Sequence, residues 1–159
     1  MGKSSLINIH TAHLEVAETY ARLSKARRLK VGAIIVKDNR VISIGYNGTP
    51  SGWDNNCEEE EIVEEDCILD EGGPPYKIRT SFLKTKPEVI HAEANAIAKL
   101  AKSSESGLNS DMYISHSPCF DCAKLIYTAG IRKVYFRQHY KSEDGIKFLE
   151  KCKIEVEKI

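Results

Sequence analysis

The sequence lacks three features that would narrow its function at once: an excess of one charge, a long apolar run and an even set of cysteines. Lys and Arg together number 23, as do Asp and Glu, so the formal net charge is zero. A nucleic-acid-binding domain usually carries a basic surface, and this balance disfavours a long polyanionic partner. The apolar stretches are far too short to span a membrane. The cysteines number five, and no signal-peptide-like run opens the chain, which disfavours a secreted disulfide framework.

These absences predict a soluble protein of the cytoplasm with neither a nucleic-acid nor a membrane partner. A length of 159 residues is enough for one domain with a full core and short for two. We therefore expect a single domain over residues 1–159. Only the motifs of the sequence can indicate which molecule this domain binds or converts.

Segments of helical and of strand character alternate along the chain. We expect helices at residues 11–28, 88–102, 119–129 and 142–151, and strands at 31–36, 40–45, 111–115, 133–136 and 154–156. The turn between the first two strands falls at Asp38 and Asn39. This order implies an α/β fold with helices on both faces of a central five-stranded mixed sheet, which makes three layers.

Residues 53–87 interrupt this pattern. The segment contains acidic runs at 58–61 and 64–66, and residues 72–75 are Gly-Gly-Pro-Pro, which disfavours regular structure. Its apolar content is too thin for a core. We therefore expect an acidic insertion within the single domain, without helices or strands of its own.

Two cysteines of the insertion, Cys57 and Cys67, are ten residues apart, without a second Cys-x-x-Cys beside them. They could join His10 or His13 in a metal site. The alternative is that both are free thiols, and the missing second Cys-x-x-Cys favours it.

Two short motifs carry the chemistry: His91-Ala92-Glu93 and, further along the chain, Ser117-Pro118-Cys119-Phe120-Asp121-Cys122. A catalytic zinc takes three protein ligands and keeps its fourth position for water. His91, Cys119 and Cys122 supply the three ligands. Glu93 is near enough to His91 to move the proton of the water without occupying the metal. The pattern resembles the signature of zinc-dependent nucleobase deaminases.

The same residues could instead be a core histidine and two ordinary buried cysteines. The order and spacing of the two motifs favour the metal site. Each motif also falls in the first turn of an expected helix, where Pro118 is well tolerated and the amide dipoles favour thiolate and carboxylate groups. The expected reaction is hydrolytic removal of an amino group from a heterocycle, with Glu93 as the proton carrier.

Two further segments allow both a functional and a plain structural interpretation. Residues 24–28 bring a basic cluster to the end of the first expected helix, where cations often serve only to cap the C-terminus. Residues 45–52 are dense in Gly and Pro and form a loop after a strand, where binding groups and ordinary turns are both common. The residues alone leave both alternatives open.

Four segments together closely resemble the deoxycytidylate (dCMP) deaminase family, and its phage-encoded members most of all in size and motif. These segments are residues 31–33 (Val-Gly-Ala), 45–52 (Gly-Tyr-Asn-Gly-Thr-Pro-Ser-Gly), 91–97 (His-Ala-Glu-Ala-Asn-Ala-Ile) and 117–126 (Ser-Pro-Cys-Phe-Asp-Cys-Ala-Lys-Leu-Ile). The second segment discriminates, because other branches of the superfamily lack it. The resemblance runs from the first helix to the last strand and is weakest in the insertion.

This resemblance implies a cytidine-deaminase-like three-layer sandwich and zinc-dependent hydrolysis of dCMP to dUMP and ammonia, which feeds thymidylate synthesis. A phage-encoded member would act in the host cytoplasm. Asn47 would hydrogen-bond the 3′-hydroxyl of the sugar, and Tyr140 would close over the nucleotide. Ser24 and Arg28 would hold the 5′-phosphate.

The resemblance further implies that the Ala92 N–H and the Ser117 carbonyl orient the base. Members of the family are typically hexamers that dCTP activates and dTTP inhibits, with Mg²⁺ on the triphosphate. Both effectors would use the loop that contains Gly48, Ser51 and Gly52, near a subunit interface. Coupling through one loop that touches two ligands is physically reasonable.

One position departs from some relatives: this chain has Ala26 where they carry a cysteine for a second, structural zinc, so a second zinc is not expected. Two alternative functions remain. A deaminase of tRNA or single-stranded nucleic acid is disfavoured by the neutral charge and by residues 45–52. A zinc-stabilised, non-catalytic nucleotide-binding module is disfavoured by Glu93, because a purely structural zinc needs a fourth ligand rather than a free carboxylate.

Overall fold

The centre of the molecule is one five-stranded sheet. The computed structural model describes residues 8–67 and 73–159. The sheet has the strand order β2-β1-β5-β6-β7, with β1 (Gly32–Lys37), β2 (Arg40–Tyr46), β5 (Asp111–His116), β6 (Lys133–Gln138) and β7 (Glu155–Lys158). β1 pairs antiparallel with β2 and β5, whereas β6 runs parallel to β5 and β7. The predicted five-stranded mixed sheet is confirmed.

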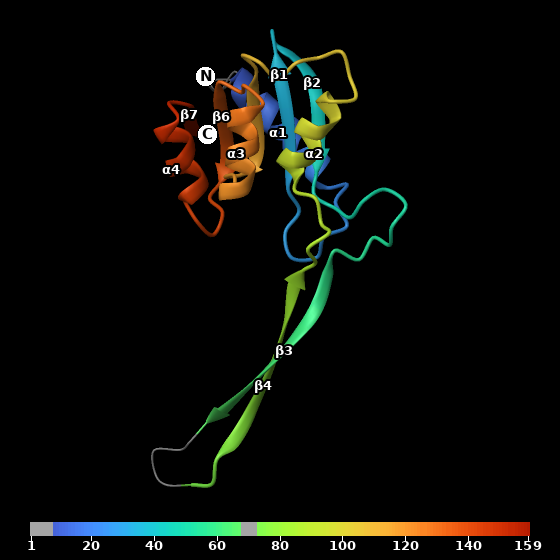
Figure 1. Cartoon of the computed structure of the whole chain (residues 1–159), viewed down its shortest axis with the longest axis vertical. Coiled ribbons are helices and arrows are strands. Elements are labelled where there is room, and N and C mark those ends of the chain that lie inside the picture. The colour runs from blue at the N-terminus through green and yellow to red at the C-terminus, as the bar shows by residue number, and fades with distance from the viewer. Residues whose placement is uncertain (1–7, 68–72) are drawn as a thin grey trace, which may run out of the picture.

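Helices cover both faces of this sheet (Figure 1). α1 (Ile9–Ala21) packs on one face, and α2 (Ala92–Leu100), α3 (Phe120–Thr128) and α4 (Asp144–Lys151) pack on the other. Buried side chains alternate along β1: Ile34 packs with Leu14 of α1, whereas Ile35 packs with Ala96 of α2. Such a period of two is expected for a strand that is buried on both faces. The predicted three-layer arrangement is therefore confirmed.

The turn predicted at Asp38 and Asn39 joins β1 to β2. Both residues have positive φ angles, 48° and 59°, as a type I′ hairpin turn requires. Asp and Asn tolerate this left-handed conformation better than most residues. The tight turn places Lys37 opposite Arg40 and so sets the register at this end of the sheet.

The first helix is shorter than predicted. α1 ends at Ala21, so the basic residues 24–28 lie in a loop and do not cap the C-terminus of the helix. The physical reason is that the backbone N–H groups of Arg27 and Arg28 donate to the carboxylate of Glu58, whereas in a helix they would donate to carbonyl groups four residues earlier. Within the described residues, no helix combines the length and the apolar character needed to cross a bilayer.

α2 packs closely against β2. Gly45 makes this possible, because a β-carbon there would collide with the Ala92 carbonyl and the Ala96 backbone. Ser43 of β2 donates a hydrogen bond to the Ala96 carbonyl (2.6 Å), and the Asn95 amide donates to the carbonyl of the last residue of β2 (3.0 Å). These contacts fix the N-terminal end of α2, which carries one of the two site motifs.

The segment predicted to lack regular structure forms a long β-hairpin instead. β3 (Glu58–Cys67) and β4 (Tyr76–Thr85) pair antiparallel over their full length, and the hairpin projects away from the sheet (Figure 1). Residues 68–72 lie outside the described part of the chain. The expectation of a single domain with an insertion at 53–87 stays a prediction.

The prediction for this segment was wrong because it did not weigh the cations of β4 against the acidic charges of β3. Cations on β4 lie opposite them: Lys84 Nζ is 2.9 Å from Glu61 Oε2, and Lys77 Nζ is 3.8 Å from Glu64 Oε2. Opposite charges on facing strands stabilise a pair of strands, and like charges destabilise it. The acidic strand therefore depends on its basic partner.

Candidate functional site

His91 and Glu93 lie at the N-terminus of α2. His91 is the N-cap residue, just before the first turn in which it was predicted, and Glu93 lies within that turn. The segment before His91 is held by an isolated bridge, in which the Gly48 N–H donates to the Ile90 carbonyl (3.1 Å) and the Ile90 N–H donates to the Gly48 carbonyl (2.9 Å). The loop after β2 thus fixes where α2 begins.

Cys119 and Cys122 lie at the N-terminus of α3. Cys119 is the N-cap and Cys122 is in the first turn. Pro118 was predicted in the first turn, but it precedes the N-cap. The Cys122 backbone N–H donates to Cys119 Sγ (3.5 Å). N–H donors and the dipole at a helix N-terminus favour the thiolate form of cysteine, which is the form that binds metal.

The two helix N-termini bring three ligand atoms together. Cys119 Sγ lies 3.5 Å and Cys122 Sγ lies 3.4 Å from His91 Nδ1, and all three atoms lie within 4.8 Å of one another. A tetrahedral zinc with Zn–S of about 2.3 Å and Zn–N of about 2.0 Å would separate nitrogen and sulfur by about 3.5 Å. Thiolate and imidazole ligands also suit zinc. These three residues, hereafter the triad, therefore fit a zinc ion with one position left open.

Glu93 lies beside the triad and is only 5% exposed. Burial raises the pKa of its carboxyl group to about 7, although its own backbone N–H, the charge of His91 and the thiol of Cys122 oppose this rise. A carboxyl group with a pKa near neutrality can accept a proton and give it back at little cost. The environment thus suits the role predicted for Glu93.

The two thiols of the triad differ in acidity. The hydrogen bond from Cys122 holds the pKa of the Cys119 thiol well below its usual range, and His91 lowers it further. The same hydrogen bond, together with burial, raises the pKa of the Cys122 thiol. The protein thus stabilises one thiolate by itself, and a bound cation would favour loss of the second proton.

The alternative metal site in the insertion does not form. Cys57 and Cys67 are free thiols, and Cys57 packs with Ala26 in a small buried apolar cluster. In the part of the chain that the structure describes, the triad is the one group of three or more ligating side chains that are close enough to share a metal. His10 and His13 are not brought to either cysteine in such a group.

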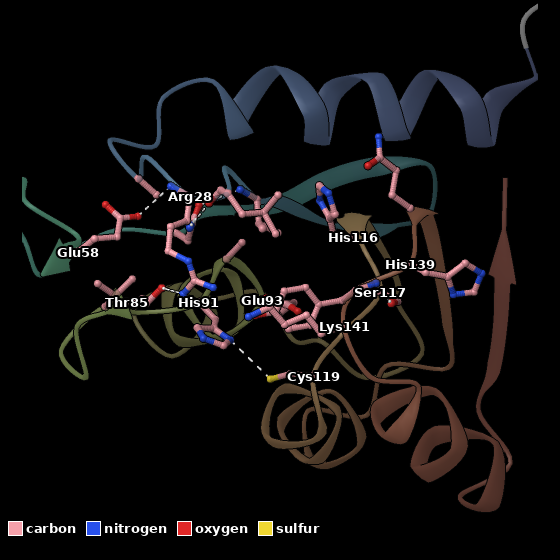
Figure 2. Close-up of a pocket in the computed structure, with 18 residues that line it drawn as sticks. Arg28, Glu58, Thr85, His91, Glu93, His116, Ser117, Cys119, His139 and Lys141 are labelled. Atoms are coloured by element: carbon pink, nitrogen blue, oxygen red, sulfur yellow. Dashed lines mark hydrogen bonds between the residues drawn. The ribbon is translucent and has the colours of Figure 1, made fainter. Parts of the chain in front are cut away.

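A cavity of about 350 Å³ opens beside the triad, within the size range of small-molecule sites. The predicted site residues that line it are His91, Glu93, Cys119, Arg28, Asn47, Ala92, Ser117 and Tyr140. Figure 2 shows Arg28 reaching into this space from the loop after α1, with His91, Glu93 and Cys119 below it. Segments far apart in the sequence thus meet in one pocket. Cys122 is buried behind its wall.

Asn47 holds the wall of the cavity through its side-chain amide. Its Oδ1 accepts from the Val31 N–H (2.8 Å), and its Nδ2 donates to the Leu29 carbonyl (2.8 Å). An amide has two donor hydrogens and two acceptor lone pairs, so one of each remains for a ligand. The loop that carries Arg28 is thereby tied to the end of β2.

Of the two remaining residues predicted to bind substrate, Ser24 and Tyr140, only Tyr140 lines the cavity. Ser24 does not line the cavity: it is buried, and its hydroxyl accepts from the Ala26 N–H (3.2 Å). Tyr140 does line it, and its backbone N–H donates to the Ser117 hydroxyl (2.8 Å). That bond joins the segment after β6 to the segment before α3.

Six polar residues that the sequence did not single out also line the cavity: Glu58, Thr85, His116, Gln138, His139 and Lys141. His116 ends β5, and burial lowers its pKa. Its position directly before the Ser-Pro-Cys motif could have drawn attention to it, as could the position of Lys141 directly after Tyr140. Glu58 and Thr85 gave no such signal, because they reach the cavity only when the hairpin forms.

A second cavity, of about 590 Å³, lies next to the first. The loop of residues 48–52 lines it, together with Lys25, Trp53 and Lys99. Asn47 lines both cavities. The three predicted effector residues, Gly48, Ser51 and Gly52, therefore line this second cavity and not the one beside the triad.

Comparison with known proteins identifies relatives that cover most of the chain. Residues 7–138 match the model of the cytidine and deoxycytidylate deaminase zinc-binding region. The deoxycytidylate deaminase of Enterobacteria phage T4 is 34% identical over 156 residues, which cover 83% of this chain and 79% of the relative. The human deoxycytidylate deaminase is 38% identical over 125 residues, which cover 77% of this chain and 61% of the relative.

A solved structure matches as closely. The dCMP deaminase of cyanophage S-TIM5, in complex with dCMP and dUMP, is 41% identical, with a TM-score of 0.77 and complete coverage of both chains. The likeness therefore includes the hairpin region as well as the sheet and its helices.

Proposed function

The chain belongs to the cytidine and deoxycytidylate deaminase family, and we propose that it hydrolyses dCMP to dUMP and ammonia. The observation that carries the proposal is that a single cavity is lined by His91, Glu93 and Cys119 and also by Arg28. A nucleotide in this cavity would present its base to the first group and its phosphate to Arg28. The similar S-TIM5 enzyme has been solved with dCMP and dUMP bound.

His91, Cys119 and Cys122 would hold a zinc ion, since their donor atoms and spacing suit it. When bound, zinc would lower the pKa of a water molecule at the open position. Glu93 would accept one proton from the water that attacks C4 of the cytosine ring and deliver it to the ring nitrogen next to C4. It would then accept the proton of the hydroxyl group now attached to C4 and give it to the amino group, which leaves as ammonia while the C4 carbonyl forms.

The remaining cavity residues would orient the nucleotide. Ala92 is the first residue of α2, and helix geometry leaves its N–H without an acceptor inside the helix. This N–H and the Ser117 carbonyl would hold the base, and the free donor and acceptor of Asn47 would serve the 3′-hydroxyl. Tyr140 would close over the nucleotide, with Lys141 beside it as an additional cation.

Arg28 would bind the 5′-phosphate, because its guanidinium group matches phosphate in shape and charge. Ser24 would act indirectly: its hydroxyl is taken up by the Ala26 N–H, so it would hold the loop of Arg28 rather than contact the phosphate. The product dUMP would supply thymidylate synthesis, in the cytoplasm of the cell or, for a phage protein, of its host.

The second cavity would bind the triphosphate effectors dCTP, an activator, and dTTP, an inhibitor, with Mg²⁺ on the triphosphate. Lys25 and Lys99 supply positive charge there, and the exposed Trp53 offers a surface on which a base can stack. Asn47 lies in the wall between the two cavities and would pass the effect of one ligand to the other. We also propose that the protein is a homohexamer.

The proposal is tested by the loss of cytosine absorbance and the release of ammonia when the zinc-loaded protein is given dCMP, deoxycytidine or single-stranded DNA. We expect dCMP to be deaminated with a kcat/KM at least about tenfold above that of deoxycytidine, because a charge-assisted phosphate contact is worth a factor of that order. Added dCTP should raise the rate and dTTP should lower it.

Other outcomes decide between the alternatives. Equal turnover of dCMP and deoxycytidine would refute the phosphate site at Arg28. Turnover of single-stranded DNA alone would favour a nucleic-acid deaminase. If no substrate reacts although zinc and dCMP both bind, the protein is a binding module.

A further inference from the structure

Glu58, the first residue of β3, is a buried carboxylate in an otherwise exposed acidic run. It is 1% exposed, whereas Glu59 and Glu60 are exposed. Its Oε1 accepts from the backbone N–H groups of Arg27 (3.0 Å) and Arg28 (3.2 Å), and its Oε2 accepts from that of Arg27 (3.2 Å). A buried carboxylate is costly unless such donors satisfy it. Glu58 therefore fixes the backbone on which Arg28 stands.

The neighbouring arginines take separate tasks. Arg27 Nε lies 3.5 Å from Glu58 Oε2, and Arg27 Nη2 donates to the Glu58 carbonyl (3.2 Å). Arg27 thus balances the charge of Glu58 from the solvent side. Arg28 points into the cavity instead (Figure 2), so an anion in the cavity meets the guanidinium group of Arg28 beside a carboxylate that is already neutralised.

Thr85, the last residue of β4, holds the side chain of Arg28. Its hydroxyl accepts from Arg28 Nη1 (3.0 Å), and Thr85 stands directly opposite Glu58 in the hairpin. Glu58 and Thr85, hereafter the root of the hairpin, therefore hold Arg28 at two points: Glu58 binds its backbone N–H, and Thr85 binds its guanidinium group. One of the five guanidinium N–H donors is used, and the other four remain for a ligand.

We propose that Glu58 and Thr85 are positioning residues that preset Arg28 for the 5′-phosphate, so that the root of the hairpin determines the preference for nucleotide over nucleoside. The proposal rests on the proposed function, deamination of dCMP. A free arginine side chain loses much rotamer freedom when it binds a phosphate, and one that is already held loses less. Removing either contact should therefore weaken binding of dCMP and spare the chemical step.

The test compares kcat and KM for dCMP and deoxycytidine in the zinc-loaded wild type, Glu58→Gln and Thr85→Val. Both substitutions keep the shape of the side chain. We expect Glu58→Gln to lower the preference for dCMP over deoxycytidine about tenfold, the size of one charge-assisted hydrogen bond, through the KM for dCMP. Thr85→Val should lower it about threefold. Glu60→Gln and Thr80→Val, exposed on the same two strands, are the matched controls and should leave the preference unchanged.

A purely structural role is excluded by repeating both substitutions in an Arg28→Ala background. We expect neither to change the preference there, because the group that they position is gone. Equal losses for both substrates, or an undiminished effect without Arg28, would overturn the proposal. If Glu58→Gln does not fold, Thr85→Val decides alone. If the wild type shows no preference for dCMP, the proposed function fails, whereas a preference that survives both substitutions refutes only the positioning role.

Discussion

Two parts of the candidate site, hereafter the metal end and the phosphate end after their proposed ligands, are built in different ways. At the metal end, His91, Glu93, Cys119 and Cys122 come from two short motifs at the N-termini of α2 and α3. At the phosphate end, Arg28 stands in a loop and is held by groups 30 and 57 residues away in the sequence. The first end is built from two local motifs, each at the start of a helix, whereas the second exists only after the hairpin has formed.

On the proposed function, this difference would separate reaction chemistry from substrate choice. The metal end holds groups that any hydrolytic deaminase of this type needs, and two helix N-termini hold them rigidly. The other end depends on contacts between a loop and the root of a projecting hairpin. Changes at the metal end should therefore affect all substrates alike, and changes at the other end should affect phosphorylated substrates most.

The largest effect is expected for Cys119→Ala. With one of three ligands gone, the site should lose zinc and, with it, measurable turnover of both dCMP and deoxycytidine. Metal content by atomic absorption and the dCMP assay provide the measurement. Cys67→Ala, which removes a free thiol of β3, is the control and should keep both zinc and activity. A fully active, zinc-free Cys119→Ala protein would contradict the assignment of the triad.

Glu93→Gln should come next. Loss of a proton carrier typically costs about 10²–10⁴-fold in rate, and the loss should be the same for both substrates because it affects the reaction and not the phosphate. Zinc content should stay at the wild-type level, since Glu93 is not a ligand. Glu88→Gln, at the next carboxylate towards the N-terminus, is the matched control. Loss of zinc from the Glu93→Gln variant would contradict the assignment of Glu93 as a proton carrier that does not bind the metal.

Arg28→Ala should have a smaller and selective effect. A charge-assisted hydrogen bond is worth about 1.5–3 kcal/mol, so kcat/KM for dCMP should fall about tenfold to a hundredfold while that for deoxycytidine changes far less. Arg22→Ala, at an exposed arginine next to the end of α1, is the control. Equal losses for the two substrates would remove the distinction between the two ends.

The smallest effect is expected for Lys84→Gln, which breaks the ion pair with Glu61 on the exposed part of the hairpin. Surface ion pairs contribute little to stability because solvent screens them, so the midpoint of thermal unfolding should fall slightly and the kinetic constants should not change. Calorimetry and the dCMP assay test both statements. A marked rise in the KM for dCMP would show that the whole hairpin, and not only its root, shapes the cavity.

The clustering of His91, Cys119 and Cys122 could be predicted because these residues lie within local motifs. His91, Glu93, Cys119 and Cys122 meet because each pair stands at a helix N-terminus, and helix periodicity is visible in a single sequence. The order of strands and helices was sufficient for the three-layer fold with its mixed sheet, for the same reason. The errors in these predictions concern the bounds of helices and strands. Pro118, for example, lies before α3 and not in its first turn.

The other end could not be predicted, because tertiary contacts decide it. Residues 24–28 have a helical pattern, yet the N–H groups of Arg27 and Arg28 donate to Glu58, which is distant in the sequence. β3 and β4 each look irregular alone and are stabilised only as a pair. Ser24 shares its segment with Arg28, but the path of the loop turns the two side chains to different places.

The most direct test of the account is a crystal structure of the zinc-loaded Glu93→Gln variant with dCMP, which should bind substrate without converting it. We expect the cytosine ring beside the triad and residue 93, and the 5′-phosphate within hydrogen-bond distance of the guanidinium group of Arg28, itself still held by Glu58 and Thr85. A phosphate bound elsewhere, with Arg28 pointing away from it, would contradict the division of the candidate site into a metal end and a phosphate end.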